Sequence, residues 1–345
     1  MVKNIDQLIR TNIFNLAPYS SAREEYPGKD GVFLDANEMP FGMFNRYPDP
    51  YQLILKRRIA EIKNSNIDTI FIGNGSDEVI DIAFRIFCNP GKDKALTFFP
   101  TYGMYDVAAN INDVQLIKLP LNNDFQIDVP ALVPYLNDKN LKLIFICSPN
   151  NPTGNLIPTE DISFILENFN GIVLLDEAYI DFSNQKSFID KINIYPHLIV
   201  SQTLSKAWGM AGIRLGVAYM NQQILSYYNK VKAPYNISSV NQLEALKLLT
   251  NVEETQQQIQ DILVEKQKMQ KELENIKTVR KVYPSDTNFF LIEVEDADQV
   301  YDQLIKQHII VRNRNSVVKN CIRITIGTVQ ENQKLINALK KINNG

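Results

Sequence analysis

The sequence is poor in cysteine and histidine. Its 345 residues include three cysteines and two histidines. Cys88, Cys147 and Cys321 are far apart and form no CxxC pair, so we predict neither a zinc site nor a disulfide framework. This cysteine usage fits a reducing cytoplasm. We therefore expect a cytoplasmic protein without a bound metal, whose mechanism does not depend on histidine.

The chain also lacks an excess of positive charge and any long apolar run. Its formal net charge is −3 at pH 7, which gives no electrostatic footprint for nucleic acid or an anionic membrane. No stretch approaches the roughly 18 apolar residues of a membrane span. The first ten residues mix Lys3, Asp6 and Arg10 with short apolar pieces, unlike a secretory signal. We expect neither a nucleic-acid nor a membrane partner.

What the chain does contain is an alternation of apolar runs with stretches of helical spacing. Such alternation predicts an α/β fold, with a large domain whose mostly parallel mixed sheet is flanked by helices and buried on both faces. The expected strands lie at residues 69–72, 95–99, 115–119, 142–147, 171–175 and 197–200. Residues 32–38 are also expected to form a strand that runs into a polar loop.

The length suggests two domains rather than one simple core. We predict an N-terminal arm at residues 1–30 that contributes to the small domain, a large domain at 31–245 and a smaller α+β domain at 246–345. Residues 252–277 lack glycine and proline and carry a narrow apolar stripe, which predicts a long amphipathic helix between the domains. A coiled coil is the alternative. Beyond it we expect strands at 288–294, 309–311 and 322–326, with helices at 297–307 and 330–342.

Polar side chains follow the predicted strands at the points where they end. Asn151, Asp176, Tyr179 and Lys206 all occupy such positions. Because ligands of open α/β sheets bind at the carboxyl ends of the strands, we expect these four residues in one cleft. A lysine in a loop of small residues could form a Schiff base with a carbonyl compound. Taken singly, Lys206 also fits a solvated surface lysine, and Asp176 fits a helix cap.

Two groups of residues suit a phosphate. In the Lys206 loop, Thr203, Ser205 and Arg214 offer hydroxyls and a guanidinium group. Earlier, the small residues at 73–77 let backbone N–H groups approach an anion at a helix N-terminus. This second signal is weak by itself, because many turns between a strand and a helix look similar.

Together the motifs resemble the fold type I, pyridoxal-phosphate-dependent aminotransferases along the whole chain. The resemblance is carried by Gly75-Ser76-Asp77-Glu78, Ser148-Pro149-Asn150-Asn151-Pro152-Thr153-Gly154, Asp176-Glu177-Ala178-Tyr179 and Ser205-Lys206 followed by Arg214. Within that class the sequence most resembles the histidinol-phosphate aminotransferase family. Those signatures are Pro18 to Arg23, Asp35-Ala36-Asn37-Glu38, Arg46-Tyr47-Pro48, Asp176 to Phe182 and Ile322 to Thr328. Trp208-Gly209-Met210 departs from the commoner Phe-Gly-Leu-like run, and the bulk of Trp208 is expected to alter packing behind the lysine.

The resemblance implies a role for each site residue. Lys206 would hold pyridoxal 5'-phosphate covalently and act as the base, and Asp176 would pair with the pyridine nitrogen. Tyr102 would stack on the ring, while Tyr179 and Asn151 would hydrogen-bond its phenolic oxygen. The phosphate contacts would come from Gly75, Ser76, Asp77, Thr203, Ser205 and Arg214, with Tyr47 reaching in from the neighbouring subunit. The site would thus be shared in a homodimer.

The implied activity is transamination of L-histidinol phosphate with 2-oxoglutarate, which yields imidazole acetol phosphate and glutamate in histidine biosynthesis. Tyr19, Asn37, Arg312 and Arg323 are the expected substrate-binding residues, with Arg314 as the alternative to Arg312. The alternatives of the same fold are an aromatic amino-acid aminotransferase and a threonine-phosphate decarboxylase. A non-enzymatic cofactor-binding regulator is disfavoured, because such proteins usually carry an added DNA-binding segment and we find none before Phe33.

Overall fold

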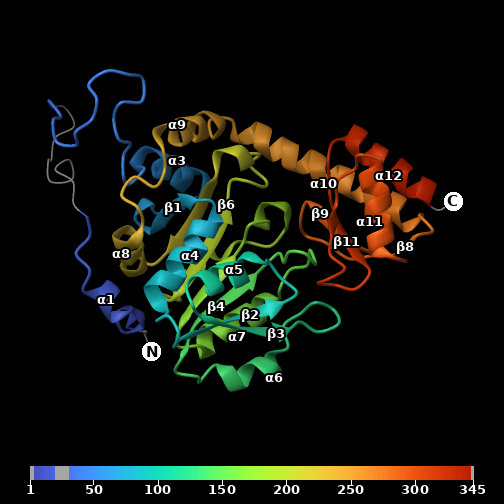
Figure 1. Cartoon of the computed structure of the whole chain (residues 1–345), viewed down its shortest axis with the longest axis horizontal. Helices are drawn as coiled ribbons and strands as arrows, with labels where there is room; N and C mark the ends of the chain where they lie inside the picture. Colours follow the sequence, from blue (N-terminus) through green and yellow to red (C-terminus); the bar gives the residue numbers. More distant parts are fainter. Residues whose placement is uncertain (1–3, 20–30, 343–345) are drawn as a thin grey trace.

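A seven-stranded mixed sheet forms the larger part of the molecule (Figure 1). The computed structural model describes residues 4–19 and 31–342. In the order β1-β7-β6-β5-β4-β2-β3 only β7 runs antiparallel to its neighbours, so the predicted mostly parallel mixed sheet is confirmed. The strands are β1 (Ile70–Asn74), β2 (Lys94–Phe99), β3 (Gln115–Pro120), β4 (Leu141–Cys147), β5 (Ile172–Asp176), β6 (Leu198–Thr203) and β7 (Leu215–Met220).

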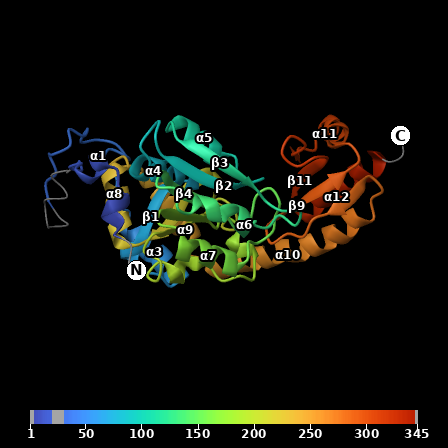
Figure 2. The same ribbon diagram turned by 90° about the horizontal axis from the view of Figure 1, so that it is seen from below.

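Helices cover both faces of this sheet, as Figure 2 shows. One apolar core joins the sheet to α3 (Leu53–Lys63), α6 (Val129–Leu132), α7 (Thr159–Asn168) and α9 (Ser239–Leu248). The core on the other face joins it to α4 (Ser76–Phe87), α5 (Met104–Ile111) and α8 (Gln222–Val231). The central strands β4, β5 and β6 are almost wholly buried, which explains their continuous apolar runs.

The smaller unit is a four-stranded antiparallel sheet with two helices, reached along the long helix α10 (Val252–Glu274) (Figure 1). Its strand order is β10-β11-β9-β8, and its core includes the C-terminal half of α10. The elements are β8 (Val279–Val282), β9 (Phe289–Val294), α11 (Ala297–Lys306), β10 (Arg312–Asn313), β11 (Cys321–Thr325) and α12 (Val329–Ile342). α10 confirms the predicted inter-domain helix, whereas β8 was not foreseen.

The N-terminal segments differ from expectation in two places. The described part of the arm, including α1 (Thr11–Phe14), packs on α4 and α8 of the larger unit, while residues 20–30 lie outside the described residues. The domain division at residues 31 and 246 stays a prediction, and residue 246 falls within α9. The strand expected at 32–38 is wrong, because Val32 and Leu34 are exposed and no strand of the described residues pairs with this segment.

The strand expected at 309–311 is also displaced. His308 has a positive φ of 58°, and the ladder to β11 forms only at Arg312 and Asn313. No helix in the described ranges combines the length and the apolar character needed to span a membrane.

Candidate active site

A cavity of about 360 Å³ lies where the larger sheet meets the smaller unit. It collects the strand-end residues of β4, β5 and β6, the turn between β1 and α4, and side chains of β10 and β11. Thirteen of the predicted site residues line it: Gly75, Ser76, Asp77, Tyr102, Asn151, Asp176, Tyr179, Thr203, Ser205, Lys206, Arg214, Arg312 and Arg323. Cys147, Ala178 and Arg314 line it as well. The four residues that the carboxyl-end rule assigned to one cleft, Asn151, Asp176, Tyr179 and Lys206, are among these lining residues.

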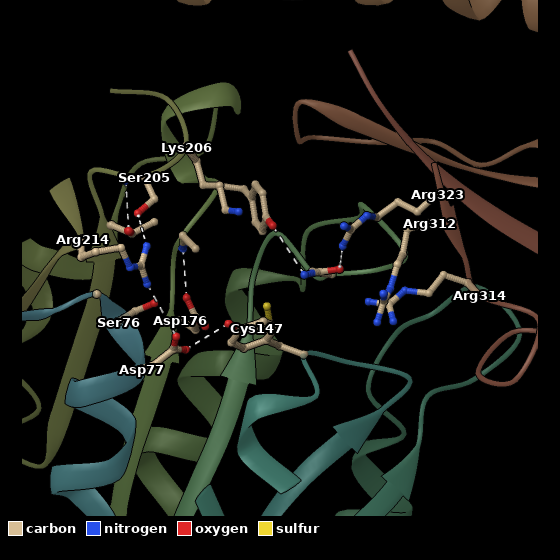
Figure 3. A pocket seen from close by; sticks show the side chains of 16 residues that line it. Ser76, Asp77, Cys147, Asp176, Ser205, Lys206, Arg214, Arg312, Arg314 and Arg323 are labelled. Carbon is tan, nitrogen blue, oxygen red and sulfur yellow. Dashed lines mark hydrogen bonds and ion pairs between the residues drawn. The ribbon is translucent and has the colours of Figure 1, made fainter. Parts of the chain in front are cut away.

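Lys206 projects into the middle of this cavity (Figure 3). Its loop is fixed by backbone hydrogen bonds from Leu204 to Leu215 and from Met210 to Leu204. Burial lowers the pKa of Lys206, and the nearby Arg323 guanidinium lowers it further. The result is an amine that loses its proton more easily than a surface lysine, as a nucleophile or base requires.

Asp176 lies at the end of β5 and is almost completely buried. Burial raises its pKa to about 6, although hydrogen bonds from the Tyr105 hydroxyl at 2.9 Å and the Ala178 N–H at 3.1 Å oppose the rise. Tyr105 is a site residue that the sequence analysis missed. The sequence offered one sign of it, its position three residues after Tyr102 near the start of a helix. Its hydrogen-bond partner Asp176, however, lies 71 residues away along the chain.

One end of the cavity is built for an anion. Gly75 has φ +75°, and a Cβ there would lie 2.8 Å from Arg214 Nη2. The N–H groups of the first turn of α4 follow it, at the positive end of that helix. Arg214 Nη1 donates to Ser205 Oγ at 3.4 Å. The Thr203 hydroxyl donates to the Leu215 carbonyl, so its predicted contact with a phosphate stays a prediction.

Tyr102 lines the cavity, and its predicted stacking on the cofactor ring stays a prediction. Its hydroxyl donates to Asp77 Oδ1 at 3.0 Å, and its ring meets Tyr105 edge to face, with 5.7 Å between centroids. Burial and the neighbouring Asp77 carboxylate raise the pKa of Tyr102, so it remains a neutral phenol. A fixed neutral ring of this kind offers a surface on which a flat heteroaromatic ring can stack.

The opposite end of the cavity carries three guanidinium groups (Figure 3). Arg323 donates to Asn151 Oδ1 at 2.5 Å and lies 5.1 Å from the Phe289 ring centroid. Asn151 in turn reaches the Tyr179 hydroxyl at 3.5 Å. The Nε atoms of Arg323 and Arg314 are buried without a hydrogen-bond partner.

Arg314, kept as the alternative to Arg312, thus faces the cavity together with it. Burial lowers the pKa of both Arg314 and Arg323. Repulsion from Arg323 and Arg312 lowers the pKa of Arg314 further, whereas the pKa of Arg323 is raised in part by Tyr179 and lowered by Arg312. Within the described part of the chain, none of the three forms an ion pair with a carboxylate. Concentrated, unneutralised positive charge in a cavity is suited to an anionic ligand.

Three predicted residues lie outside the cavity of their own chain. Tyr47 stacks on Tyr235 at a centroid separation of 4.4 Å, and Asn37 and Tyr19 are exposed. Glu38 holds this segment together, accepting hydrogen bonds from Arg46 and from the Tyr47 N–H. The roles assigned to Tyr19, Asn37 and Tyr47 remain predictions.

The residues present fit pyridoxal phosphate. A phosphate suits the turn at Gly75, where the space that a Cβ would fill is left for the guanidinium of Arg214. The buried Asp176 carboxylate has hydrogen bonds but, among the described residues, no cationic partner in contact, and a protonated pyridine nitrogen would supply one. Lys206 would hold the cofactor between these two anchors, with Tyr102 against the ring and Tyr179 and Asn151 at its edge.

Comparison with known proteins agrees with this geometry. The family model for aminotransferases of class I and II matches residues 29–339. The chain is 49% identical to a histidinol-phosphate aminotransferase of Parabacteroides distasonis and 48% identical to one of Christiangramia forsetii, with 99% of each chain covered.

Solved structures show the same fold. The histidinol-phosphate aminotransferase from Clostridium acetobutylicum superposes with a TM-score of 0.80 at 26% identity, covering 87% of this chain and 91% of that one. The enzyme from Sinorhizobium meliloti, in complex with pyridoxal-5'-phosphate, has a TM-score of 0.79 at 22% identity, over 87% of this chain and 83% of that one. With full-length identities near one half, the chain belongs to the class I and II aminotransferases and, among them, to the histidinol-phosphate aminotransferase family.

Proposed function

We propose that this protein transfers the amino group of L-histidinol phosphate to 2-oxoglutarate, yielding imidazole acetol phosphate and glutamate in histidine biosynthesis. The observation that carries the proposal is the cluster of Arg312, Arg314 and Arg323 facing Lys206 across one cavity. Both amino donors of the reversible reaction, histidinol phosphate and glutamate, have an anionic group at the end away from the reacting amine. Guanidinium groups bind phosphate and carboxylate in a bidentate manner, so one cluster can serve both.

Pyridoxal phosphate supplies the electron sink that makes the Cα proton of an amine labile. Side chains of the protein would move the proton and hold the cofactor in place. Lys206, with its lowered pKa, would remove the proton from Cα of the substrate. The same amine would then return a proton at the other end of the 1,3-proton shift. Asp176 would hold the protonated pyridine nitrogen of the cofactor, and its burial would make that ion pair stronger than it would be in water. Burial also raises the pKa of Tyr179, so its phenol remains a hydrogen-bond donor at neutral pH.

The test is a direct assay of the purified protein with pyridoxal phosphate. We expect glutamate to form from 2-oxoglutarate only when histidinol phosphate is present. Phosphothreonine and phenylalanine serve as alternative substrates, because a decarboxylase or an aromatic aminotransferase of the same fold would use them. Release of CO₂ from phosphothreonine without glutamate formation from histidinol phosphate would overturn the proposal.

We also propose that the enzyme is a homodimer with shared active sites. The segment at residues 32–54 exposes an unusual number of large apolar side chains, which in a stable protein marks an interaction surface. Val32, Leu34 and Met43 are each nearly 90% exposed, and Phe41, Phe44 and Ile54 are exposed by more than half. Tyr47 lies in the same segment, outside its own cavity, where a second copy could receive it.

Complementation tests the shared site. Lys206→Ala and Tyr47→Ala chains should each be impaired as pure preparations. After mixing and subunit exchange, hybrid dimers would hold one intact site, so about a quarter of the wild-type activity should return. Activity that stays at the level of the separate variants, while native mass spectrometry of isotope-labelled chains shows exchanged dimers, would exclude sharing.

The cytoplasm is the proposed location. Cys88, Cys147 and Cys321 are all free thiols buried within the fold. Burial raises the pKa of each thiol, which leaves them in the protonated form that persists in a reducing compartment.

A further inference from the structure

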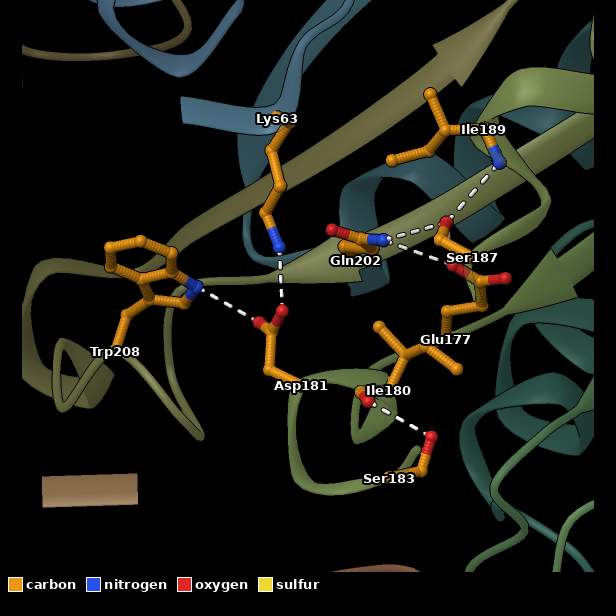
Figure 4. A network of polar contacts seen from close by, with 9 residues as sticks. All are labelled: Lys63, Glu177, Ile180, Asp181, Ser183, Ser187, Ile189, Gln202 and Trp208. Atoms are coloured by element: carbon orange, nitrogen blue, oxygen red, sulfur yellow. Dashed lines mark hydrogen bonds and ion pairs between the residues drawn. The ribbon is translucent and has the colours of Figure 1, made fainter. Parts of the chain in front are cut away.

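A carboxylate next to the active site has no place in the chemistry described so far. Asp181 follows Tyr179 in a short 3₁₀ turn (Ile180–Phe182), and its side chain is three-quarters buried. Its Oδ2 accepts the indole N–H of Trp208 at 2.9 Å, and its Oδ1 lies 2.6 Å from Lys63 Nζ (Figure 4). Lys63 also lies 5.5 Å from the centroid of the Trp208 ring. We refer to Lys63, Asp181 and Trp208 as the indole clamp.

Trp208 belongs to the loop that carries Lys206. Only Ala207 separates the two residues, and a turn closes between them through a hydrogen bond from Gly209 N–H to the Lys206 carbonyl at 3.2 Å. Where the Trp208 side chain is held therefore determines how the backbone of Lys206 is oriented. Asp181 is likewise two residues from Tyr179, which lines the cavity. The clamp thus joins the two polypeptide segments whose side chains must meet at the reacting atoms.

The indole is packed on one side only. It lies against the apolar core beside Leu204 and Val217, but Trp208 is partly exposed and its other side borders a cavity of about 390 Å³ near α3 and α10. In this half-open setting, the hydrogen bond to Asp181 is the polar contact that fixes the direction of the indole N–H. An interaction with an ionised acceptor is stronger than one between neutral groups, and the low exposure of Asp181 and Lys63 reduces screening.

We propose that Asp181 is a positioning residue for Lys206, acting through the indole N–H of Trp208 and itself held by Lys63. This rests on the proposed function only in that Lys206 is the reacting lysine. Asp181 is not among the residues that line the active-site cavity. Its effect is geometric: it holds the Lys206 amine at the distance and angle that proton transfer at Cα requires, where displacement by about 1 Å can cost 100-fold in rate.

Three substitutions separate the contacts of the clamp. Trp208→Phe keeps an aromatic ring but removes the donor, Asp181→Asn keeps an acceptor oxygen but removes the charge, and Asp181→Ala removes both. We expect kcat to fall about tenfold in both Trp208→Phe and Asp181→Ala and about threefold in Asp181→Asn, with KM values within about twofold of wild type. Asp181→Ala combined with Trp208→Phe should be no slower than Asp181→Ala alone, because the two residues act through one hydrogen bond.

A distant ion pair supplies the matched control. Lys94 and Asp138 form an ion pair of 2.8 Å with similar side-chain exposure, at the opposite ends of the strands from the cavity. Asp138→Ala should leave kcat unchanged. A second readout avoids turnover: the dissociation constant of pyridoxal phosphate, followed by its absorbance, should rise about tenfold in Asp181→Ala and not in Asp138→Ala.

The proposal fails if kcat per folded molecule is unchanged in Asp181→Ala, if Asp138→Ala has the same effect, or if the losses of the double variant are additive. These outcomes are distinct from failure of the proposed function. Were histidinol phosphate not the substrate, wild-type protein would show no turnover with it, yet the cofactor dissociation constants would still report on the clamp.

Discussion

The two ends of the active-site cavity attract anions by different means. At the end near α4 the groups are mainly backbone N–H donors of one turn, and the single guanidinium, Arg214, is half exposed and lies 3.9 Å from Asp77. At the other end the groups are three arginine side chains of the smaller unit, two of them with buried Nε atoms that lack partners. The end near α4 is suited to an anion by its local backbone geometry, and the other end by the positive charge of its three arginines.

This difference fits the two ligands that the ends would hold. A cofactor phosphate is bound throughout the catalytic cycle, so a rigid backbone cradle that requires little rearrangement is appropriate. Substrates come and go, and they differ in length between histidinol phosphate and 2-oxoglutarate. Long arginine side chains on a separate unit can adjust to both, and their mutual repulsion is relieved when an anion binds.

Lys206 stands between the two ends, and its removal has the largest predicted effect. Lys206→Ala should lower kcat by about 10⁴-fold or more, because both the covalent attachment and the proton-transferring base are lost. Lys206→Arg, which keeps the charge, should be equally inactive. Glutamate formation in a coupled assay measures both. Residual activity within tenfold of wild type in either variant would remove Lys206 from the mechanism.

Substituting one arginine at each end of the cavity tests whether the two ends bind different ligands. Arg323→Lys keeps a charge but loses the fork of donors, so KM for both substrates should rise about 100-fold while the cofactor dissociation constant stays within about threefold. Arg214→Met should do the reverse, weakening the cofactor about 30-fold with KM little changed at saturating cofactor. Steady-state kinetics and absorbance titration give the two constants. If each variant changes both constants equally, the ends are not independent.

Asp176 belongs to neither end, and its burial carries a cost in stability. Its folded pKa of about 6 lies above the value for an unfolded chain, so the folded protein binds more protons between about pH 4 and 6. Stability therefore falls as the pH rises through this interval and stays reduced above it. Asp176→Asn should stabilise the cofactor-free protein at pH 7, by up to about 3 kcal/mol.

Urea unfolding of the cofactor-free protein at pH 7 and pH 4 measures this effect. The stability difference between Asp176→Asn and wild type should shrink to about 0.5 kcal/mol at pH 4, where the aspartate is protonated in the folded state and about half ionised in the unfolded chain. A difference of equal size at both pH values would show that the gain comes from packing and not from titration.

The sequence was sufficient for the backbone-built end because its signals are local. A strand followed by Gly75-Ser76-Asp77 and a helix is a weak sign of an anion site, but it can be read from consecutive residues, and Lys206 lies in a loop just past a strand. The resemblance then linked these local signals in the right order. The mostly parallel mixed sheet could be predicted for the same reason, since each buried strand is a continuous apolar run.

The arginine end could not be resolved in this way. Choosing between Arg312 and Arg314 requires the position of β10, which was expected three residues too early. In the structure Arg312 is paired with Arg323 across the ladder, and alternation along the strand direction places Arg314 toward the same side. Tyr105 and Asp181 were missed because their partners are defined by tertiary packing, across 71 and 27 residues of sequence.

The smallest predicted effect concerns Gly75, and it tests how rigid the backbone-built end is. Its φ of +75° disfavours any residue with a Cβ, and that Cβ would approach Arg214 Nη2 to 2.8 Å. Gly75→Ala should weaken the cofactor about tenfold, through strain of about 1 kcal/mol and a shifted guanidinium. Gly103→Ala, where a Cβ would meet nothing within 4 Å, is the matched control. If Gly75→Ala binds the cofactor as tightly as this control, the turn adapts to its ligand, and the contrast between a rigid end and an adjustable end is wrong.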